Sequence, residues 1–557
     1  LTKEQLLKEN TYKSILNFDD NYDYNDLNNK LPLLKNRNKT NILPNQDIIY
    51  IDNDDISIKT VSTLRENGNR LKIRIEIVNP KNLEIIELKI ENMDLEITDK
   101  RNIDGITYIE LIGVPNKYYD SYQITSINYL KDGEECSQDT YYLIQEAFYK
   151  EITKFEDWQN IDKESYENYK LLTDLDFSGK QNVNYNIKIG KLITEGNMHT
   201  IKNLTLNVGE QSNFGLINIL KNRMENIKFE NINIKGQNNI DINNIGIIAN
   251  NIGDIKNVEF SNINIDLPLE KTSYVGCIGT STGLEISNVT IQNINIVGKS
   301  GVGGLLGYAE YYKVNDIVAK EVHINGIENV AGIIGRAQPV NLSAGRLLKN
   351  IKITDSTVNG KTHVGGILGN IASYAAKNMT VDNCEITGEK NVGGYAGTGD
   401  HGETKTNIYV KNSTIKGINS VGGILGSGGH LTESSVIDSK IEGMTTNSTD
   451  VGGILGEQNG NLFGTSVQSS DIISKGIKVG GLVSRASYMV GNFAYNNTVE
   501  GYSYVGGIAG ALVYSTIEDN YSNSKVKATE HSAGGILGFL DNKLMDNLTN
   551  QSNIGNN

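Results

Sequence analysis

The stretch "SGVGGLLGYA", residues 300–309, places glycines between apolar side chains, a pattern shared by flexible loops, phosphate-binding loops and structural repeats. One glycine cluster does not distinguish these possibilities, but a set at regular spacing does. Related hexapeptides begin at Phe214, Ile245, Val275, Val302, Val330, Val364, Val392, Val421, Val451, Val479, Val505 and Ala533. Successive starts lie 26 to 34 residues apart, with a mean near 29. The stretch is therefore one copy of a structural repeat.

A second shared element precedes each hexapeptide, as in "NIKITDSTVNG", residues 350–360. Its apolar residues Ile351 and Ile353, and then Val358, alternate with polar ones, which indicates a strand with one buried face. The unit is too short for a βαβ crossover and has no helical period. The sequence therefore predicts a parallel β-helix, a solenoid with one coil per unit. We expect a right-handed coil and, at the ~4.8 Å spacing of neighbouring strands, a rod about 55 Å long.

Glycine and asparagine suit stacked coils for physical reasons. Stacking brings backbone close to backbone and some corners need φ > 0, and glycine permits both. Asparagine tolerates the left-handed conformation, and its amide can form ladders between coils. In the opening stretch we expect Val302 and Leu305 in the core, with Gly303, Gly304 and Gly307 at the contacts between coils.

The repeated "VGGILG" resembles the GLUG motif, and "FEDWQNID", "YKLLTDLDFSG" and "GNMHTIKNLTL" resemble the opening of the repeat region in Gram-positive IgA-specific zinc metallopeptidases and related surface proteases. The resemblance covers about residues 150–557. It implies an extracellular or cell wall-associated protein whose non-catalytic repeats help to recognise a host glycoprotein such as immunoglobulin A. The same repeats occur in adhesin-like surface proteins, which leaves an adhesin stalk as an alternative.

In those peptidases the catalytic domain follows the repeats and carries HExxH with a distant glutamate. The histidines of this chain are His199, His323, His363, His401, His430 and His531, and none of them begins HExxH. We therefore expect no catalytic residue, no metal ligand and no cofactor here. The resemblance implies zinc only for a catalytic domain elsewhere in the parent protein, and the lack of an initiator methionine indicates a piece of a longer chain.

A glycan-degrading β-helix enzyme is a third alternative, because such enzymes gather charged side chains on adjacent coils. Asp355, Asp382 and Asp438 occupy similar positions in their repeats and could stack. Like charges that stack without a cation repel one another, so we expect these aspartates to be solvated turn residues.

Two regions precede the repeats and their cap. Residues 1–46 are polar and irregular, as expected for the end of an upstream domain. Asp19, Asn21 and Asp23 have the spacing of a calcium loop, but Tyr24 replaces the required glycine and Lys30 replaces the bidentate glutamate, so that site is not expected. Residues 47–150 contain short alternating runs between turn signals, which predicts an immunoglobulin-like β-sandwich.

The segment 151–205 is expected to cap the β-helix and lead into the repeats at 206–557. Phe155, Trp158 and Ile161 lie on one face of a short predicted helix. The first coil of a solenoid exposes an unpaired strand edge, so this helix is a natural cover for it.

Composition excludes several classes of partner. The net charge is −14 without a basic block, which argues against nucleic acid and anionic membranes. No apolar run is long enough to span a bilayer. Cys136, Cys277 and Cys384 are too far apart for a metal or redox pair, and we expect them to be small buried residues.

The predicted binding residues follow from departures from the repeat. The unit after Val302 carries three tyrosines, and the longest step, from Val330 to Val364, implies an inserted loop with two arginines. Tyrosine and arginine often anchor interfaces, and loops on a rigid scaffold often carry recognition. The predicted binding residues are Tyr308, Tyr311, Tyr312, Arg336 and Arg346.

Overall fold

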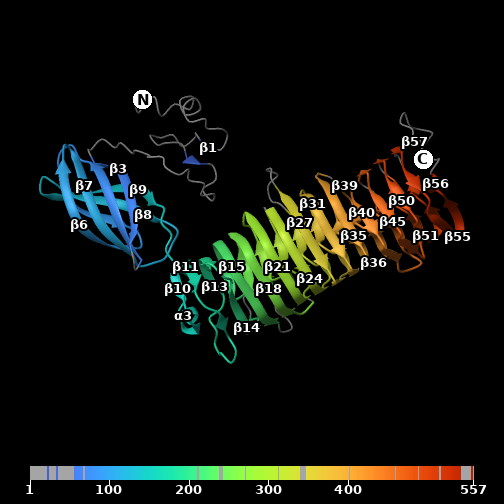
Figure 1. The fold of residues 1–557 in the computed structure, drawn as a ribbon, viewed down its shortest axis with the longest axis horizontal. Helices are drawn as coiled ribbons and strands as arrows, with labels where there is room; N and C mark the ends of the chain where they lie inside the picture. Colours follow the sequence, from blue (N-terminus) through green and yellow to red (C-terminus); the bar gives the residue numbers. More distant parts are fainter. Residues whose placement is uncertain are drawn as a thin grey trace. The chain divides into compact units, whose positions relative to one another are not determined.

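The computed structural model describes residues 22–23, 33–34, 56–66, 69–209, 213–236, 242–269, 271–310, 313–338, 346–400, 402–457, 460–486, 488–512, 516–540 and 553–555. The chain divides into two compact units, residues 1–115 with 122–144, and residues 116–121 with 145–557 (Figure 1). Two short strands, β1 (Tyr22–Asp23) and β2 (Leu33–Leu34), pair antiparallel. Asp19, Asn21, Tyr24 and Lys30, on which the calcium-loop argument depends, lie outside the described residues.

The smaller unit contains a seven-stranded antiparallel sandwich. Its sheets have the strand orders β3-β4-β7-β6 and β5-β8-β9. The strands are β3 (Ser57–Glu66), β4 (Arg70–Val78), β5 (Glu84–Ile90), β6 (Met93–Ile103), β7 (Ile106–Pro115), β8 (Tyr122–Lys131) and β9 (Glu134–Ile144). Lettered A to G in chain order, the sheets are ABED and CFG, the topology of constant-type immunoglobulin domains. The predicted immunoglobulin-like sandwich is confirmed.

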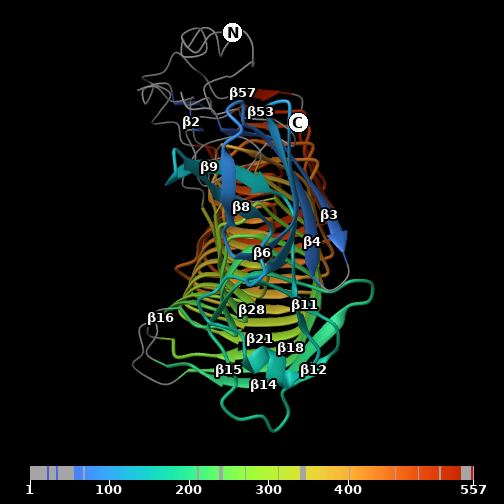
Figure 2. The same ribbon diagram turned by 90° about the vertical axis from the view of Figure 1, so that its left-hand side faces the viewer.

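The larger unit is a parallel β-solenoid of about 12 coils, as predicted, and its successive coils follow the same outline (Figure 2). The first coils consist of β10 (Lys150–Ile152), α3 (Phe155–Gln159), β11 (Asn168–Leu171), β12 (Leu175–Asp176), β13 (Ile187–Ile193), β14 (His199–Asn207) and β15 (Ile217–Lys235). No helix in the described ranges has the length and apolarity needed to cross a bilayer.

Later coils add strands to three columns. The long column first contains one strand per coil: β18 (Asp254–Asp266), β21 (Glu285–Val297), β24 (Lys313–Asn325), β27 (Leu347–Thr354), β31 (Ala375–Asp382) and β35 (Thr404–Lys411). In the later coils two shorter strands take the place of each single strand: β39 (His430–Thr432) with β40 (Ser435–Ile437), β44 (Leu462–Phe463) with β45 (Ser466–Gln468), β49 (Met489–Val490) with β50 (Phe493–Tyr495), and β53 (Thr516–Glu518) with β54 (Tyr521–Ser522). The last strand of the column, β57 (Asn553–Gly555), pairs with β53. The continuation of the long column holds β28 (Thr357–Asn359), β32 (Glu385–Thr387), β36 (Thr414–Gly417), β41 (Lys440–Gly443), β46 (Asp471–Ser474) and the starts of β51 (Thr498–Gly506) and β55 (Lys525–Gly534).

The two short columns flank the bend of each hexapeptide. The first contains β16 (Ile242–Ile245), β19 (Thr272–Val275), β22 (Ser300–Gly303), β25 (Glu328–Ala331), β29 (Thr362–Gly365), β33 (Lys390–Gly393), β37 (Asn419–Gly422), β42 (Thr449–Gly452), β47 (Ile477–Gly480) and the ends of β51 and β55. The second contains β17 (Ile248–Asn251), β20 (Ile278–Ser281), β23 (Leu306–Ala309), β26 (Ile334–Ala337), β30 (Leu368–Ile371), β34 (Ala396–Thr398), β38 (Leu425–Ser427), β43 (Leu455–Glu457), β48 (Val483–Ala486), β52 (Ala509–Leu512) and β56 (Leu537–Leu540).

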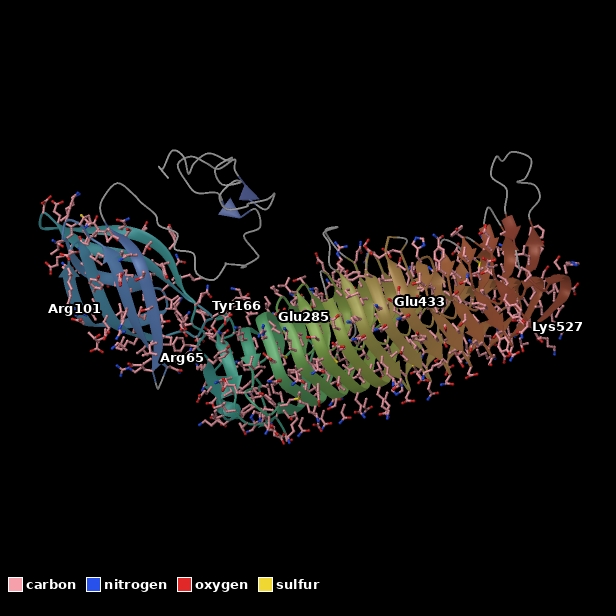
Figure 3. All side chains as sticks on the ribbon, turned by 45° about the horizontal axis from the view of Figure 1, so that its top comes forward. Arg65, Arg101, Tyr166, Glu285, Glu433 and Lys527 are labelled. Atoms are coloured by element: carbon pink, nitrogen blue, oxygen red, sulfur yellow. The ribbon has the colours of Figure 1, made fainter. Side chains whose placement is uncertain are left out.

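Apolar side chains fill the interior of the solenoid. Val302, Val330 and Val364 pair in register on successive coils, and each is fully buried. Leu305 is also fully buried, so the expected core positions of the opening stretch are confirmed. Outward positions carry polar side chains such as Glu285 (Figure 3).

The glycines of the hexapeptide are required by close backbone approach. A Cβ added to Gly304 would lie closer than 3.0 Å to the carbonyl oxygen of Gly332 on the next coil, and Gly366 has the same relation to Gly394. These glycines do not have positive φ. The stacking role is confirmed, but the expected role at left-handed corners falls mainly to other residues.

Asparagine occupies many of the left-handed corners. Asn226, Asn257 and Asn288 have φ of 59°, 51° and 53° on successive coils. The Asn257 amide donates to Asn226 Oδ1 at 2.5 Å, and the Asn288 amide donates to Asn257 Oδ1 at 2.9 Å. Each asparagine therefore adopts the left-handed conformation of the corner, and its amide forms a hydrogen bond between two coils, which confirms the predicted ladders.

The short helix predicted near Trp158 is present as α3. The Trp158 side chain is fully buried, its Nε1 donates to the Asn184 carbonyl at 2.9 Å, and its ring lies edge-on to Phe177 at 6.0 Å. Ile161 is buried just beyond the end of the helix. The helix therefore packs into the first part of the solenoid core.

Replacing Gly366 with alanine is expected to lower the thermal unfolding midpoint, because the new Cβ would collide with the Gly394 carbonyl oxygen. Overpacking of this kind costs about 1–3 kcal/mol. The matched control is Gly209→Ala, since a Cβ at Gly209 meets no atom within 4 Å. Circular dichroism melts measure the difference, and equal midpoints for the two variants would contradict close stacking.

Candidate interaction surfaces

The structure brings together two of the predicted binding residues. Tyr308 lies on β23 and Arg336 on β26, and they are register partners on adjacent coils. The prediction that Arg336 lies in an inserted loop is wrong, because β26 continues to Ala337 and holds it in the sheet. Tyr311 and Tyr312 lie outside the described residues.

Tyr308 and Arg336 belong to a half-buried ridge at the corner between the two short columns. The Tyr308 ring packs against Tyr274 with centroids 4.9 Å apart, and its hydroxyl donates to the Gln338 carbonyl at 3.2 Å. The Arg336 guanidinium donates to Gln338 Oε1. We call Tyr274, Tyr308, Arg336 and Gln338 the Tyr308 ridge.

Arg346 belongs to a different place. It directly precedes β27, and its Nη1 lies 3.4 Å from the Ser373 carbonyl oxygen, so the contact described for it is with the next coil. The structure therefore separates Arg346 from the contacts that unite Tyr308 and Arg336.

The corner of the Tyr308 ridge repeats along the rod with other side chains. The residue before the hexapeptide valine contacts an outward residue of the following coil, as His363 does with Thr398 at 2.6 Å. Asn391 also donates its amide to His363 Nδ1 at 3.2 Å, and burial lowers the pKa of His363. Asp450 and Arg485 form an ion pair of 2.8 Å at the same corner. Sequence reasoning missed this position, although it directly precedes each hexapeptide valine.

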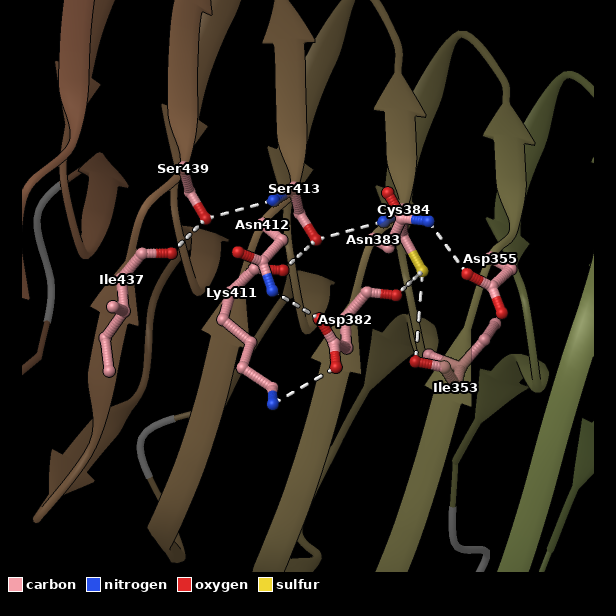
Figure 4. Close-up of polar contacts among 10 residues, drawn as sticks. All are labelled: Ile353, Asp355, Asp382, Asn383, Cys384, Lys411, Asn412, Ser413, Ile437 and Ser439. Carbon is pink, nitrogen blue, oxygen red and sulfur yellow. Dashed lines mark hydrogen bonds and ion pairs between the residues drawn. The ribbon is translucent and has the colours of Figure 1, made fainter.

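The aspartates form no stack of like charges, as expected: Asp355 and Asp438 are exposed turn residues, whereas Asp382 is half-buried at the end of β31. Asp355 shares its column with Asn383, whose amide donates to Asp355 Oδ1 at 2.8 Å (Figure 4). Asp382 lies one position earlier, where it accepts from the Asn412 amide at 2.8 Å and pairs with Lys411 at 3.1 Å. Asp438 belongs to the column of Asp355, where Asn383 and Asn412 lie between the two carboxylates, and Asp382 is offset by one position.

A shallow open depression lies beside this polar corner. It is lined by Asn412, Ser413, Thr414, Asp438, Ser439, Lys440, Ser469 and Asp471. Several of these groups bond to the next coil, as where Ser413 N–H donates to Ser439 Oγ at 3.1 Å (Figure 4). In the described ranges, no group of three or more His, Cys, Asp or Glu side chains is placed to hold a metal ion.

One lysine enters the apolar interior. Lys405 is fully buried in a position that Leu431 occupies on the next coil. Its Nζ donates to Asp400 Oδ1 at 2.5 Å, to the Asp400 carbonyl at 3.1 Å and to the Glu403 carbonyl at 2.6 Å. Burial lowers the pKa of Lys405, and the Asp400 carboxylate opposes that effect. The sequence of β35 alone does not identify Lys405 as an internal residue. The strand register does, because it pairs Lys405 with the buried Leu431.

The cysteines are free in the structure. Cys277 and Cys384 are buried as predicted, and burial raises the pKa of the Cys384 thiol to about 12. Cys136 is only partly buried, so the prediction is wrong for that residue. It lies in β9, the edge strand of its three-stranded sheet, where one side of the strand has no neighbour in that sheet.

The fold therefore defines a parallel β-solenoid protein with an immunoglobulin-like sandwich. No family model matches the chain, and no curated protein matches it. A crystal structure from Bacteroides ovatus, described as that of a "putative immunoglobulin A1 protease", has 16% sequence identity, with 59% of this chain and 77% of that chain covered and a TM-score of 0.25. A likeness of this degree assigns no function.

Replacing Lys405 with methionine is expected to cost about 3 kcal/mol at neutral pH, because Asp400 and two carbonyls lose a buried donor. The control is Lys416→Met, which removes a partly exposed pair with Glu385 and is expected to cost less than about 1 kcal/mol. Chemical denaturation of both variants measures the difference.

The same variant tests the lowered pKa. Because the pKa of Lys405 is lowered on folding, the folded chain loses this proton at a lower pH than the unfolded chain does. The free energy of unfolding therefore rises with pH between the lowered folded pKa and the ordinary value of 10.5. The methionine variant lacks that gain. The stability difference between the two proteins should therefore widen through the alkaline range below 10.5, and a difference that narrows there would contradict the lowered pKa.

Proposed function

We propose that this chain is the non-catalytic scaffold and substrate-recognition region of a secreted or cell-surface zinc metallopeptidase that acts on a host glycoprotein such as immunoglobulin A. The observation that carries the scaffold role is the unbroken register of the hexapeptide column. Val302, Val330, Val364, Val392 and Val421 pair one with the next on five successive coils.

This register makes the outer side chains members of a fixed array. Each coil bonds to the next through its backbone, and the interior is packed with apolar side chains. A side chain on one coil therefore keeps its distance from a side chain several coils away. Such preorganisation lowers the ordering cost of binding, which suits a surface that must hold a large partner.

The Tyr308 ridge is the best candidate for the recognition surface. Its column carries Thr280 on the preceding coil and Asn370 on the following one, so the adjacent tyrosine and arginine distinguish these coils from their neighbours. Tyrosine and arginine supply apolar area together with fixed hydrogen-bond donors.

The peptidase assignment and the extracellular location rest on the resemblance of the repeats to those of the IgA-specific zinc metallopeptidases. In this proposal zinc belongs to a catalytic domain elsewhere in the parent protein. An adhesin stalk would use the same scaffold without a peptidase, and the binding experiment separates the two roles.

Biolayer interferometry of the purified chain on immobilised immunoglobulin A1, with immunoglobulin G as a reference surface, tests the proposal. The expected result is binding to immunoglobulin A1 that Tyr308→Ala/Arg336→Ala weakens by about tenfold or more, equivalent to ~1.4 kcal/mol. The control is Tyr409→Ala/Lys411→Ala, which removes an aromatic ring and a cation from β35 on the long column.

Equal binding to both immunoglobulins, or none, would contradict recognition of immunoglobulin A. Equal losses for the two double variants would contradict the role of the Tyr308 ridge. Unchanged circular dichroism melts are required of both variants before either result is interpreted.

A further inference from the structure

Exposed aromatic side chains gather on the long column of the last coils. Their exposed fractions lie between 36% and 50%, which is high for rings of this size. We call this set the aromatic face: Phe463 36%, Tyr488 43%, Phe493 49%, Tyr495 47% and Tyr521 50%. It lies on different strands from the Tyr308 ridge, which is on the short columns.

The register brings these rings together. Phe493 and Tyr521 are partners on adjacent coils. Phe493 and Tyr495 flank the buried Ala494 on β50, so both point outward. The Phe463 and Tyr488 rings lie edge to face, with centroids 5.6 Å apart.

Phe463 and Phe493 lie on either side of one left-handed corner, which Gly464 forms between β44 and β45 and Gly491 forms between β49 and β50. The single strand β35 pairs with β39 through Thr406 and with β40 through Tyr409. Phe463 occupies the position of Thr406 two coils later, and Phe493 occupies the position of Tyr409 three coils later. Asn407, with φ of 56°, is the left-handed corner between these two positions on β35, so Phe463 and Tyr488 lie just across the corner from Phe493.

The apolar part of this surface is aromatic and not aliphatic. After Val318, the exposed large hydrophobic residues of the described chain are all aromatic, whereas most of those before it are Leu, Ile or Val. Protein interfaces also draw on Met and Arg around their aromatic residues. The strands that carry the aromatic face contain no arginine, and their one methionine, Met489, is buried.

The strands of the aromatic face carry no cation. Strands β44, β45, β49, β50, β53 and β54 contain no lysine or arginine, and the acidic residues beside the rings are Glu518, at the end of β53, and the exposed Asp519, at the corner before β54. Amide and hydroxyl groups flank the rings: Gln468 is the register partner of Tyr495, and Ser466 that of Phe493. Asn496 and Asn523 lie beside them, with Asn496 N–H donating to Asn523 Oδ1 at 2.7 Å. A polyanion would find no cation here, and the chain carries a net charge of −14.

We propose that the aromatic face binds a neutral oligosaccharide. The face of an aromatic ring is electron-rich, so it attracts the C–H groups on the flat side of a sugar ring. The flanking amides and hydroxyls both donate and accept, which matches sugar hydroxyls. Rings on neighbouring coils repeat at the strand spacing of ~4.8 Å, so an extended glycan contacts several rings at once. This inference is independent of the role proposed for the Tyr308 ridge.

A printed array of neutral and sialylated oligosaccharides, followed by calorimetric titration of the neutral oligosaccharide with the highest signal, tests this inference with the full chain. Phe493→Ala/Tyr521→Ala should weaken binding by about tenfold or more. Tyr521→Phe should retain most of the affinity because it keeps the ring. The matched control is Tyr409→Ala, which removes a 39% exposed ring from the column of Phe493 on an earlier coil and should leave binding unchanged.

Three results would overturn the proposal. These are the absence of any glycan signal, a preference for the sialylated oligosaccharides, or an equal loss in Tyr409→Ala. Binding to a glycoprotein that survives enzymatic removal of its glycans would assign the aromatic face to a protein partner instead. Tyr308→Ala/Arg336→Ala should leave glycan binding intact, so failure here is distinguishable from failure of the peptidase scaffold.

Discussion

The solenoid depends on the contact between the glycine backbones of successive coils. Gly366 lies so close to the Gly394 carbonyl that a single methyl group would not fit between them. This approach lets the bend of each hexapeptide pass over the next, and the in-register pairs Val364 with Val392 and Leu368 with Ala396 lie on either side of it. The apolar interior is continuous because this contact repeats.

The outer surface is free to vary because stacking uses backbone and buried side chains. Asparagine ladders, such as Asn350 on Asp316 at 2.8 Å and Asn378 on Asn350 at 2.9 Å, strengthen the corners with one exposed side chain per coil and leave the other outward positions free. Those outward positions then carry what distinguishes one coil from another. The Tyr308 ridge and the aromatic face are two such departures, on different columns of one rigid rod.

The fold was predictable from the sequence because a coil is a local unit that repeats. The hexapeptide and its preceding strand predicted the solenoid, and the turn pattern before residue 150 predicted the sandwich. The sites were less predictable because they depend on which residues stack. Tyr409 pairs with Ser435, 26 residues on, whereas Thr380 pairs with Tyr409, 29 residues on. An average period cannot place Lys405 inside the core or unite Phe493 with Tyr521, since the step changes from coil to coil.

Disulfide trapping measures this register directly. In a Cys136→Ser background, cysteines at Tyr409 and Ser435 should cross-link rapidly on mild oxidation, because outward residues in register have Cα atoms within disulfide range. Cysteines at Tyr409 and Ile437 should cross-link far more slowly, because Ile437 is the partner of Lys411. Faster linkage of the second pair would place Ile437 opposite Tyr409, two residues away from the observed register, and it would contradict the stacking on which both surfaces depend.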